Sequence, residues 1–265
     1  MHRPIFSEEH AVFRETARRF FREEYTPHRE RFEQQGHVDR GFWEKAGEMG
    51  LLCMTAPEEY GGGGVDRKFP AILLEEAGYA GASGSGFWVH SDMASPYITR
   101  YGTEAQKRKW LPELAKGRKI MAIAMSEPSG GSDLAGIRTR ADRDGDHYVL
   151  NGSKMWITNG SVADVAVVWA KVDDRVCGFL VERGTKGFTS GDVKNKFSLR
   201  ASITSELAFD DVRIPKENLL PGAEIGLRGP LQCLNQARYS IVWGALGAAM
   251  ACYDEALRYS GERRQ

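Results

Sequence analysis

The sequence has no excess of charge of either sign, because 36 lysine and arginine residues balance 36 aspartate and glutamate residues. It therefore gives no electrostatic reason to expect a nucleic acid or an anionic membrane as a partner. It also lacks an apolar run long enough to span a bilayer. Residues 1–9 lead into an amphipathic acidic segment, without the positive flank and apolar core of a signal peptide.

Cysteine is scarce, and the four cysteines are far apart in the sequence: Cys53, Cys177, Cys233 and Cys252. No two of them have the spacing of a metal-ligand pair, so the sequence predicts no metal site. Reduced thiols in an intracellular protein are the simpler interpretation.

What the sequence does contain is three zones of different periodicity. A chain of 265 residues has the size at which two or more domains become usual. Residues 1–117 show helical periodicity, residues 118–226 show that of strands, and residues 227–265 are helical again. We predict an α+β fold with an N-terminal α-helical domain, a middle antiparallel β domain and a final helical segment.

Capping residues mark the predicted helices of the first zone. Ser7 can cap a helix, and Thr103 with Gln106 forms a capping box for the last helix before Gly117. The apolar face of the first helix is expected to carry Val12, Phe13, Ala17, Phe20 and Phe21. The other predicted helices span residues 42–49, 69–79 and 86–101.

The middle zone predicts short strands rich in β-branched and aromatic residues. They span residues 148–150, 154–158, 165–172, 178–181 and 206–209. Asn151-Gly152 is a strong hairpin signal, so we expect a tight turn there and antiparallel pairing on both sides of it.

A long helix is predicted from about Gly229 onward. One stripe of it is apolar and carries Leu234, Ile241, Val242, Leu246, Ala249, Met250, Tyr253 and Leu257. About thirty residues of helix extend for roughly 45 Å, which is more than a small sheet domain covers. We expect the stripe to need a further domain or a neighbouring subunit, and packing on the N-terminal helices is the alternative.

The most informative segment is the polar, glycine-dense turn from Ala124 to Gly136, which directly follows the apolar run 120–124. It offers hydroxyls at three serines and unobstructed backbone amides at Gly130 and Gly131. Successive amides with small hydroxyls can hold a polar cofactor without a basic side chain.

This segment resembles the flavin-binding signature of the acyl-CoA dehydrogenase family, and Trp156-Ile157-Thr158 resembles that family's second flavin contact. The resemblance implies FAD as the cofactor and α,β-dehydrogenation of an acyl-CoA thioester to the trans-2-enoyl-CoA. It covers the family's N-terminal and middle domains and the first helix of a C-terminal four-helix bundle, most of which is expected to be missing from this sequence.

The resemblance also assigns cofactor contacts, which are Ile123, Met125, Ser126, Gly131, Ser132, Trp156, Ile157, Thr158 and Arg263. It implies that Met125 and Ser126 contact the isoalloxazine, that Thr158 contacts its N5, and that Arg263 reaches the pyrophosphate of a neighbouring subunit. Without the resemblance, Trp156 would be interpreted as an ordinary core aromatic.

Substrate contacts are implied at Ser132, Asn235 and Arg238. Arg238 lies inside the apolar stripe, and a buried arginine needs a partner. We expect Glu127 and Asp133 to hold the turn by accepting loop amides, and not to act as the catalytic base.

The resemblance predicts that the catalytic base is absent. Most members of the family carry the proton-abstracting glutamate in the distal bundle, whereas long-chain and isovaleryl members place it directly before the arginine that Arg238 resembles. Here that position is Ala237. No catalytic residue is therefore assigned, and we expect little or no turnover from these residues alone.

The acyl group remains open. Up to about Asp164 the sequence is similar to long-chain acyl-CoA dehydrogenases, and from about Val165 it is similar to glutaryl-CoA dehydrogenase. The alternatives are a glutaryl-CoA dehydrogenase, a non-catalytic flavin- or acyl-CoA-binding fragment, and an oxidase. The resemblance further implies electron-transfer flavoprotein as acceptor, a homo-oligomer (tetramer or dimer), and a location in the cytoplasm of a bacterium or the mitochondrial matrix of a eukaryote.

Overall fold

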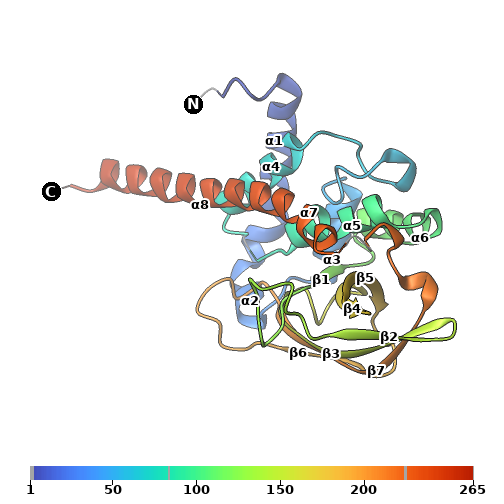
Figure 1. The fold of residues 1–265 in the computed structure, drawn as a ribbon. Helices are drawn as coiled ribbons and strands as arrows, with labels where there is room; N and C mark the ends of the chain where they lie inside the picture. Colours follow the sequence, from blue (N-terminus) through green and yellow to red (C-terminus); the bar gives the residue numbers. More distant parts are fainter. Residues whose placement is uncertain (1–2, 83, 224–225, 265) are drawn as a thin grey trace.

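The computed structural model describes residues 3–82, 84–223 and 226–264, so Met1 and Gln265, the ends of the first and last predicted domains, lie outside it. Helices from the first zone form one layer, and a curled sheet lies beneath them (Figure 1). The long helix α8 (Leu234–Glu262) runs along the helical layer and projects beyond it. This order confirms the predicted α+β fold.

The helical layer contains helices joined by short irregular turns. Its helices are α1 (Glu8–Phe20), η1 (Phe21–Tyr25), η2 (Thr26–His28), α2 (Arg29–Gln35), α3 (Arg40–Glu48), η3 (Glu58–Tyr60), α4 (Lys68–Tyr79), η4 (Val89–Ala94), α5 (Ser95–Tyr101) and α6 (Glu104–Ala115). Ser7 and Thr103 are N-cap residues as predicted, and the Thr103 hydroxyl accepts the amide of Gln106. Helix α2 was not predicted.

The predicted apolar face of α1 is wrong at one position. Val12 is 69% exposed, whereas His10, Ala17 and Phe20 are buried. These buried residues recur with the three- and four-residue spacing of one helix face, and Val12 lies off that face. The predicted helix 86–101 also differs, because η4 is π-helical and shifts the register before α5 begins.

The sheet has seven strands in the order β1-β4-β2-β3-β7-β6, and β5 pairs with β4 off this path. The strands are β1 (Met121–Ala124), β2 (Arg140–Asp144), β3 (His147–Thr158), β4 (Val165–Val172), β5 (Arg175–Glu182), β6 (Phe188–Asp192) and β7 (Thr204–Pro215). The predicted antiparallel sheet needs a correction, because β1 runs parallel to β4 and β2 meets β4 in parallel at one residue pair. The other pairings are antiparallel.

The predicted hairpin at Asn151-Gly152 is wrong. Both residues lie inside β3, which pairs with β2 and β7 through a register shift beside Gly152. Glycine is required there because φ is +145° and an added Cβ would lie 2.6 Å from Thr139 Oγ1. The hairpin turn lies instead between β2 and β3, where Gly145 has a φ of +59°.

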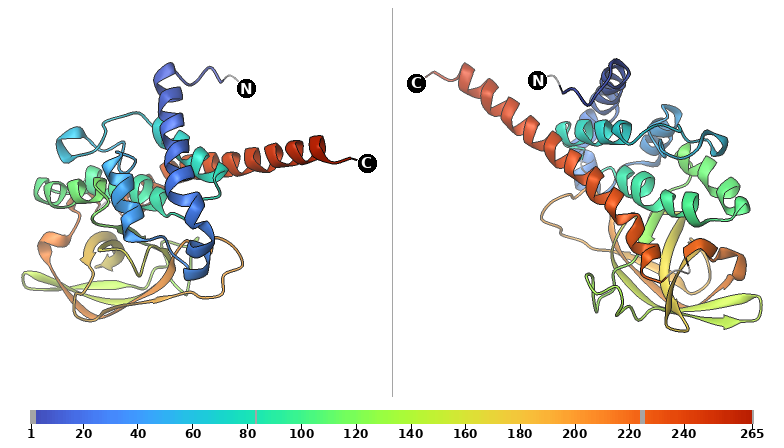
Figure 2. Two further views of the ribbon diagram at one scale, coloured as in Figure 1. Left: turned by 180° about the vertical axis from the view of Figure 1, so that it is seen from behind. Right: turned by 45° about the horizontal axis from the view of Figure 1, so that its top comes forward.

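Helix α8 packs on η4 at its start and closely on α4 around Gly244 and Gly247, and beyond this contact it projects from the molecule (Figure 2). An added Cβ at Gly78 would lie 2.1 Å from the Gly244 carbonyl oxygen, and one at Gly247 would lie 1.9 Å from that of Glu75. The apolar stripe is exposed at Ile241, Val242, Leu246, Tyr253 and Leu257. The described residues therefore do not bury it, and the alternative of full packing on the N-terminal helices is wrong. None of the described helices is both long and apolar enough to cross a membrane.

Candidate functional site

The glycine-dense turn begins where β1 leaves the core. All four residues of β1 are buried, including Ile123, and Met125 is still 9% exposed. Beyond it Ser126 is half-buried, and Gly131 and Ser132 are exposed. The turn therefore places backbone amides and hydroxyls at the surface, directly above a buried strand.

Glu127 organises this turn from below. Its carboxylate accepts the backbone amides of Arg138 (2.6 Å) and Thr139 (2.9 Å), the Thr139 hydroxyl (2.6 Å) and the Lys154 ammonium (2.9 Å). Burial alone would raise the pKa of Glu127, but these hydrogen bonds outweigh it and lower the pKa to about 2. The prediction that Glu127 holds the turn is confirmed.

Lys154 is a functional residue that sequence reasoning missed. Its side chain is fully buried and donates to the Met125 carbonyl oxygen (3.2 Å) as well as to Glu127. It thereby ties β3 to the turn that follows β1. No local pattern signals this role, since a lysine in a strand is usually solvated.

The glycines of the turn are not required by the fold itself. Neither Gly130 nor Gly131 has a positive φ. An added Cβ at Gly131 would meet nothing closer than Ser126 Oγ at 3.9 Å, and one at Gly130 would lie 3.7 Å from the Asp133 carbonyl oxygen. Asp133 accepts the Gly136 amide (3.0 Å) as predicted. Open space above these glycines leaves the backbone accessible to a ligand.

Trp156 lies beside this turn in an unusual conformation. Its φ is +64°, which costs a non-glycine residue about 1–2 kcal/mol, and its side chain is 60% exposed. The neighbouring Met155 amide donates to the Ser126 carbonyl oxygen (2.9 Å), which joins the two segments. The alternative interpretation of Trp156 as a core aromatic is wrong. Ile157 is buried, and Thr158 is half-buried.

These features fit a flavin. An exposed indole, an exposed turn at the end of a strand, and glycines that packing does not require together form a cradle for a flat, polar ring. Met125, Ser126, Trp156 and Thr158 are the residues that would hold it. FAD would supply the hydride-accepting ring.

Of the predicted substrate residues, Ser132 lies in the turn after β1, and Asn235 and Arg238 lie at the start of α8. Asn235 and Arg238 are both exposed, and the Arg238 guanidinium donates only a long hydrogen bond (3.4 Å) to Asn235 Oδ1. The argument that Arg238 is buried and needs a partner is therefore wrong. The conformation of the Arg238 side chain therefore depends on which surface covers the exposed face of α8.

Arg263 lies far from the turn, after the last residue of α8. Its guanidinium donates to the Tyr259 hydroxyl (2.6 Å). The helix carries it about 40 Å beyond Asn235, so within one chain it is not brought together with Ser126 or Trp156. The predicted contact with the flavin of a neighbouring subunit stays a prediction.

The first turns of α8 offer no carboxylate at the predicted position of the base, because Ala237 is buried there. One turn further along, Ser240 hydrogen-bonds to Asp92 of η4. Burial raises the pKa of the Asp92 carboxyl to about 7, opposed by Ser240 and Arg67. Sequence reasoning missed Asp92, because only the packing of η4 against α8 buries it. Among the described residues, no group of His, Cys, Asp and Glu could hold a metal ion.

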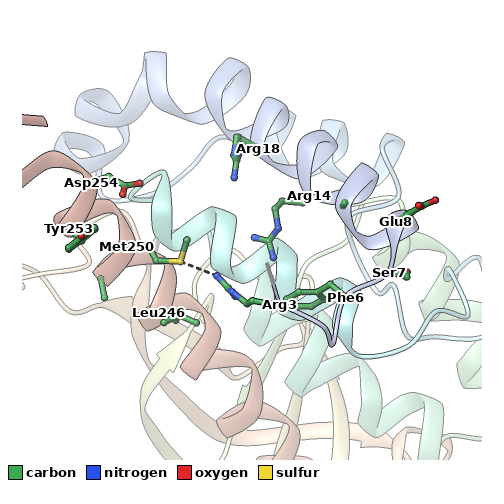
Figure 3. A pocket seen from close by; sticks show the side chains of 12 residues that line it. Arg3, Phe6, Ser7, Glu8, Arg14, Arg18, Leu246, Met250, Tyr253 and Asp254 are labelled. Carbon is green, nitrogen blue, oxygen red and sulfur yellow. Dashed lines mark hydrogen bonds between the residues drawn. The ribbon is translucent and has the colours of Figure 1, made fainter. Parts of the chain in front are cut away.

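A large cavity of about 1070 Å³ lies elsewhere, between α1 and α8 (Figure 3). Three arginines line it, but their charges are engaged by two buried carboxylates. Arg3 and Arg14 pair with Glu75, and Arg14 and Arg18 pair with Glu76. This cavity is a groove beside the exposed face of α8 and not part of the flavin cradle.

Comparison with known proteins identifies the family. Models of the N-terminal, middle and C-terminal domains of acyl-CoA dehydrogenase match residues 7–118, 122–212 and 225–265. The long-chain specific acyl-CoA dehydrogenase of Sus scrofa mitochondria is 43% identical over 99% of this chain and 63% of its own length. The chain thus spans just under two thirds of that relative.

Solved structures give the same result. Acyl-CoA dehydrogenase from Geobacillus kaustophilus has a TM-score of 0.95 and 40% identity, covering 100% of this chain and 71% of the other. Glutaryl-CoA dehydrogenase from Mycobacterium smegmatis in complex with FADH2 has a TM-score of 0.92 and 40% identity, covering 98% of this chain and 67% of the other. The chain belongs to the acyl-CoA dehydrogenase family of FAD-dependent oxidoreductases, as the resemblance of the turn after β1 predicts.

Proposed function

We propose that these residues form the flavin-binding part of an enzyme that dehydrogenates an acyl-CoA thioester to the trans-2-enoyl-CoA. One observation carries the proposal: the Glu127–Lys154 pair holds the turn after β1, and Ser126 of that turn is hydrogen-bonded to Met155, the residue before the exposed Trp156. A cradle of this kind positions a flat ring, while the reacting thioester would approach from α8.

The residues divide the work in a definite way. Met125 and Ser126 would hold the flavin ring through backbone and hydroxyl groups, Trp156 would pack beside it, and Thr158 would offer it a hydroxyl. Ser132, Asn235 and Arg238 hold the acyl-CoA. The further cofactor contacts that we propose are Ile123, Gly131, Ile157 and Arg263.

The proton-abstracting carboxylate is not assigned to any of these residues. Because Ala237 stands at the position of one family base, a missing base would lower the rate by about 10²- to 10⁴-fold. A non-catalytic flavin- or acyl-CoA-binding role is the second candidate, and the same alanine favours it. The acyl group stays open between a long-chain and a glutaryl substrate, because both kinds of relative match nearly the whole chain.

The partners and the location follow from the same resemblance. We propose electron-transfer flavoprotein as electron acceptor and a homo-oligomer, either dimer or tetramer, as the complete enzyme. The relatives include mitochondrial and bacterial proteins. The corresponding locations are the mitochondrial matrix in a eukaryote and the cytoplasm in a bacterium.

Titration with FAD tests the binding part of the proposal. We expect flavin fluorescence to be quenched on binding, and Trp156→Ala to weaken FAD affinity by about tenfold or more, since aromatic contact with a flat ring is worth about 1–3 kcal/mol. Phe197→Ala is the matched control, because Phe197 is an aromatic that is 98% exposed outside the cradle. Equal affinity of all three proteins would contradict the cradle.

Turnover tests the catalytic part. Reduction of an artificial electron acceptor is measured with acyl-CoA as substrate and FAD at saturation. We expect FAD binding with little or no turnover. Robust turnover would show that a base exists among these residues, and rapid formation of peroxide would identify an oxidase.

A further inference from the structure

A small cavity on the opposite side of α8 from Asn235 and Arg238 has the features of an anion site. It has a volume of about 250 Å³ and is lined by three separate segments: the loop before α4, helix α5, and the first turn of α8. Arg67 and Arg100 line it from the first two segments, and Gln236 lines it from the third. It shares no residue with the flavin cradle or with the predicted acyl-CoA contacts.

The two arginines have no ionic partner among the described residues. In residues 3–82, 84–223 and 226–264, neither guanidinium has a hydrogen bond or an ion pair, in contrast to Arg3, Arg14 and Arg18 in the groove beside α1. Both side chains line the same cavity, and both lie near Cys233. Burial raises the pKa of the Cys233 thiol to about 11, and the positive charges of Arg100 and Arg67 both oppose this rise.

Among the described residues, no acid forms an ion pair with either arginine. Asp66, which precedes Arg67 in the sequence, is bonded to Lys68 and lies 3.6 Å from His10. Asp92 acts on Arg67 from a distance, but its carboxyl is buried and hydrogen-bonded to Ser240. A positive potential therefore remains at the mouth of the cavity.

Gln236 adds a hydrogen-bonding group to the cavity wall. It is only 5% exposed, and its amide has no hydrogen bond to any other described residue. The atoms of its side-chain amide are not among the buried atoms that lack a partner in the described residues, so the amide is open to the cavity. Its NH2 group can donate to an anion that the two guanidiniums hold.

We propose that this cavity binds a small dianion, a phosphate or a short dicarboxylate, between Arg67, Arg100 and Gln236. The volume is below that of pockets for drug-sized ligands, which excludes a nucleotide. The bound anion joins the helical layer to the first turn of α8. Because Asn235 and Arg238 lie on the exposed side of that turn, the anion fixes the segment that carries the predicted substrate contacts.

Calorimetric titration of the 265-residue protein with inorganic phosphate and with glutarate, at constant ionic strength in chloride and with FAD present, tests this inference. We expect saturable binding of at least one anion, weakened by about tenfold or more in Arg67→Gln and in Arg100→Gln. Arg175→Gln is the matched control, because Arg175 is also exposed but does not line the cavity. It should bind as the unchanged protein does.

A second measurement covers the case in which a variant fails to fold. The arginine Nε resonances of the unchanged protein should shift for two side chains on addition of the anion. Absence of both saturable heat and such shifts would overturn the inference, as would equal weakening by Arg175→Gln. Displacement of the anion by octanoyl-CoA would also overturn it, because the cavity would then belong to the thioester site. None of these outcomes depends on flavin binding or turnover.

Discussion

The flavin cradle and the start of α8 differ in how their functional residues are held. In the cradle, two interactions within the chain hold the turn. The Glu127 carboxylate pairs with the Lys154 ammonium, and the Met155 amide donates to the Ser126 carbonyl oxygen. At the start of α8, Asn235 and Arg238 contact little beyond each other. The turn is therefore held by contacts within these residues, whereas the start of α8 has few such contacts.

The largest change in stability is expected when the ion pair beneath the turn is removed. Glu127→Gln leaves Lys154 charged and buried without a carboxylate, so we expect a loss of about 3–5 kcal/mol in the free energy of unfolding. Chemical denaturation measures it. Asp133→Asn is the control, because Asp133 is exposed and bonds only a local amide, and it should change stability by about 1 kcal/mol or less. Equal stability of Glu127→Gln and the unchanged protein would show that the pair does not hold the turn.

The pH dependence of Glu127 follows with a definite sign. Its pKa is about 2 in the folded protein, below the ordinary value of 4.5. The stabilisation is therefore fully present above the ordinary pKa and is lost as the pH falls from about 4.5 toward 2. Acid unfolding of the unchanged protein should be steep in this window, and Glu127→Gln should lack that steepness.

A second test lies at the boundary between the two regions, where Asp92 meets α8. Its pKa is raised from 3.8 to about 7, so the folded protein holds its proton more tightly than the unfolded chain. Stability is therefore lost as the pH rises through this window. Relative to the unchanged protein, Asp92→Asn should gain roughly 2–3 kcal/mol between pH 5 and pH 8. Denaturation at the two pH values measures this, and a constant difference would contradict it.

A third test compares the packed and the open half of α8. Gly247→Ala would place a methyl group against the Glu75 carbonyl oxygen, so we expect a loss of about 1–3 kcal/mol. Gly261→Ala is the matched control in the same helix, where an added Cβ meets nothing within 4 Å. It should stabilise by up to about 1 kcal/mol through helix propensity. Thermal unfolding of both variants measures the difference between their changes in stability. Equal changes would contradict close contact between α4 and α8.

The smallest effect is expected on the exposed stripe. Tyr253→Ser and Leu257→Ser should change the free energy of unfolding by less than about 0.5 kcal/mol, because both side chains are more than half exposed. A larger loss would mean that these side chains are covered in solution, for example by a second copy of the chain. Analytical ultracentrifugation of the unchanged protein would then show whether it is a monomer or an oligomer.

Local signals in the sequence predicted much of the fold. The Thr103 capping box and the role of Asp133 each depend on residues three positions apart, and the strand pattern depends on alternation within each strand. The family resemblance added the cofactor, since composition alone indicates only a polar ligand.

Long-range contacts account for what could not be predicted. Asn151-Gly152 has the composition of a hairpin turn, but its glycine is needed where Thr139 crosses β3. The burial of Lys154 depends on Glu127, 27 residues away in the sequence. Arg238 was expected inside an apolar surface, yet the exposure of that surface depends on which elements cover α8.

The contact between Gly78, Gly244 and Gly247 has a consequence for the direction of α8. Since main-chain atoms of the two helices touch there, the crossing angle is set by the peptide units and not by side-chain rotamers that could repack. Substitutions elsewhere along α8 can alter the side chains that it presents without changing the direction of the helix axis. A partner that binds the exposed face of α8 must therefore fit the direction that α4 gives the helix, because α8 cannot rotate about this contact.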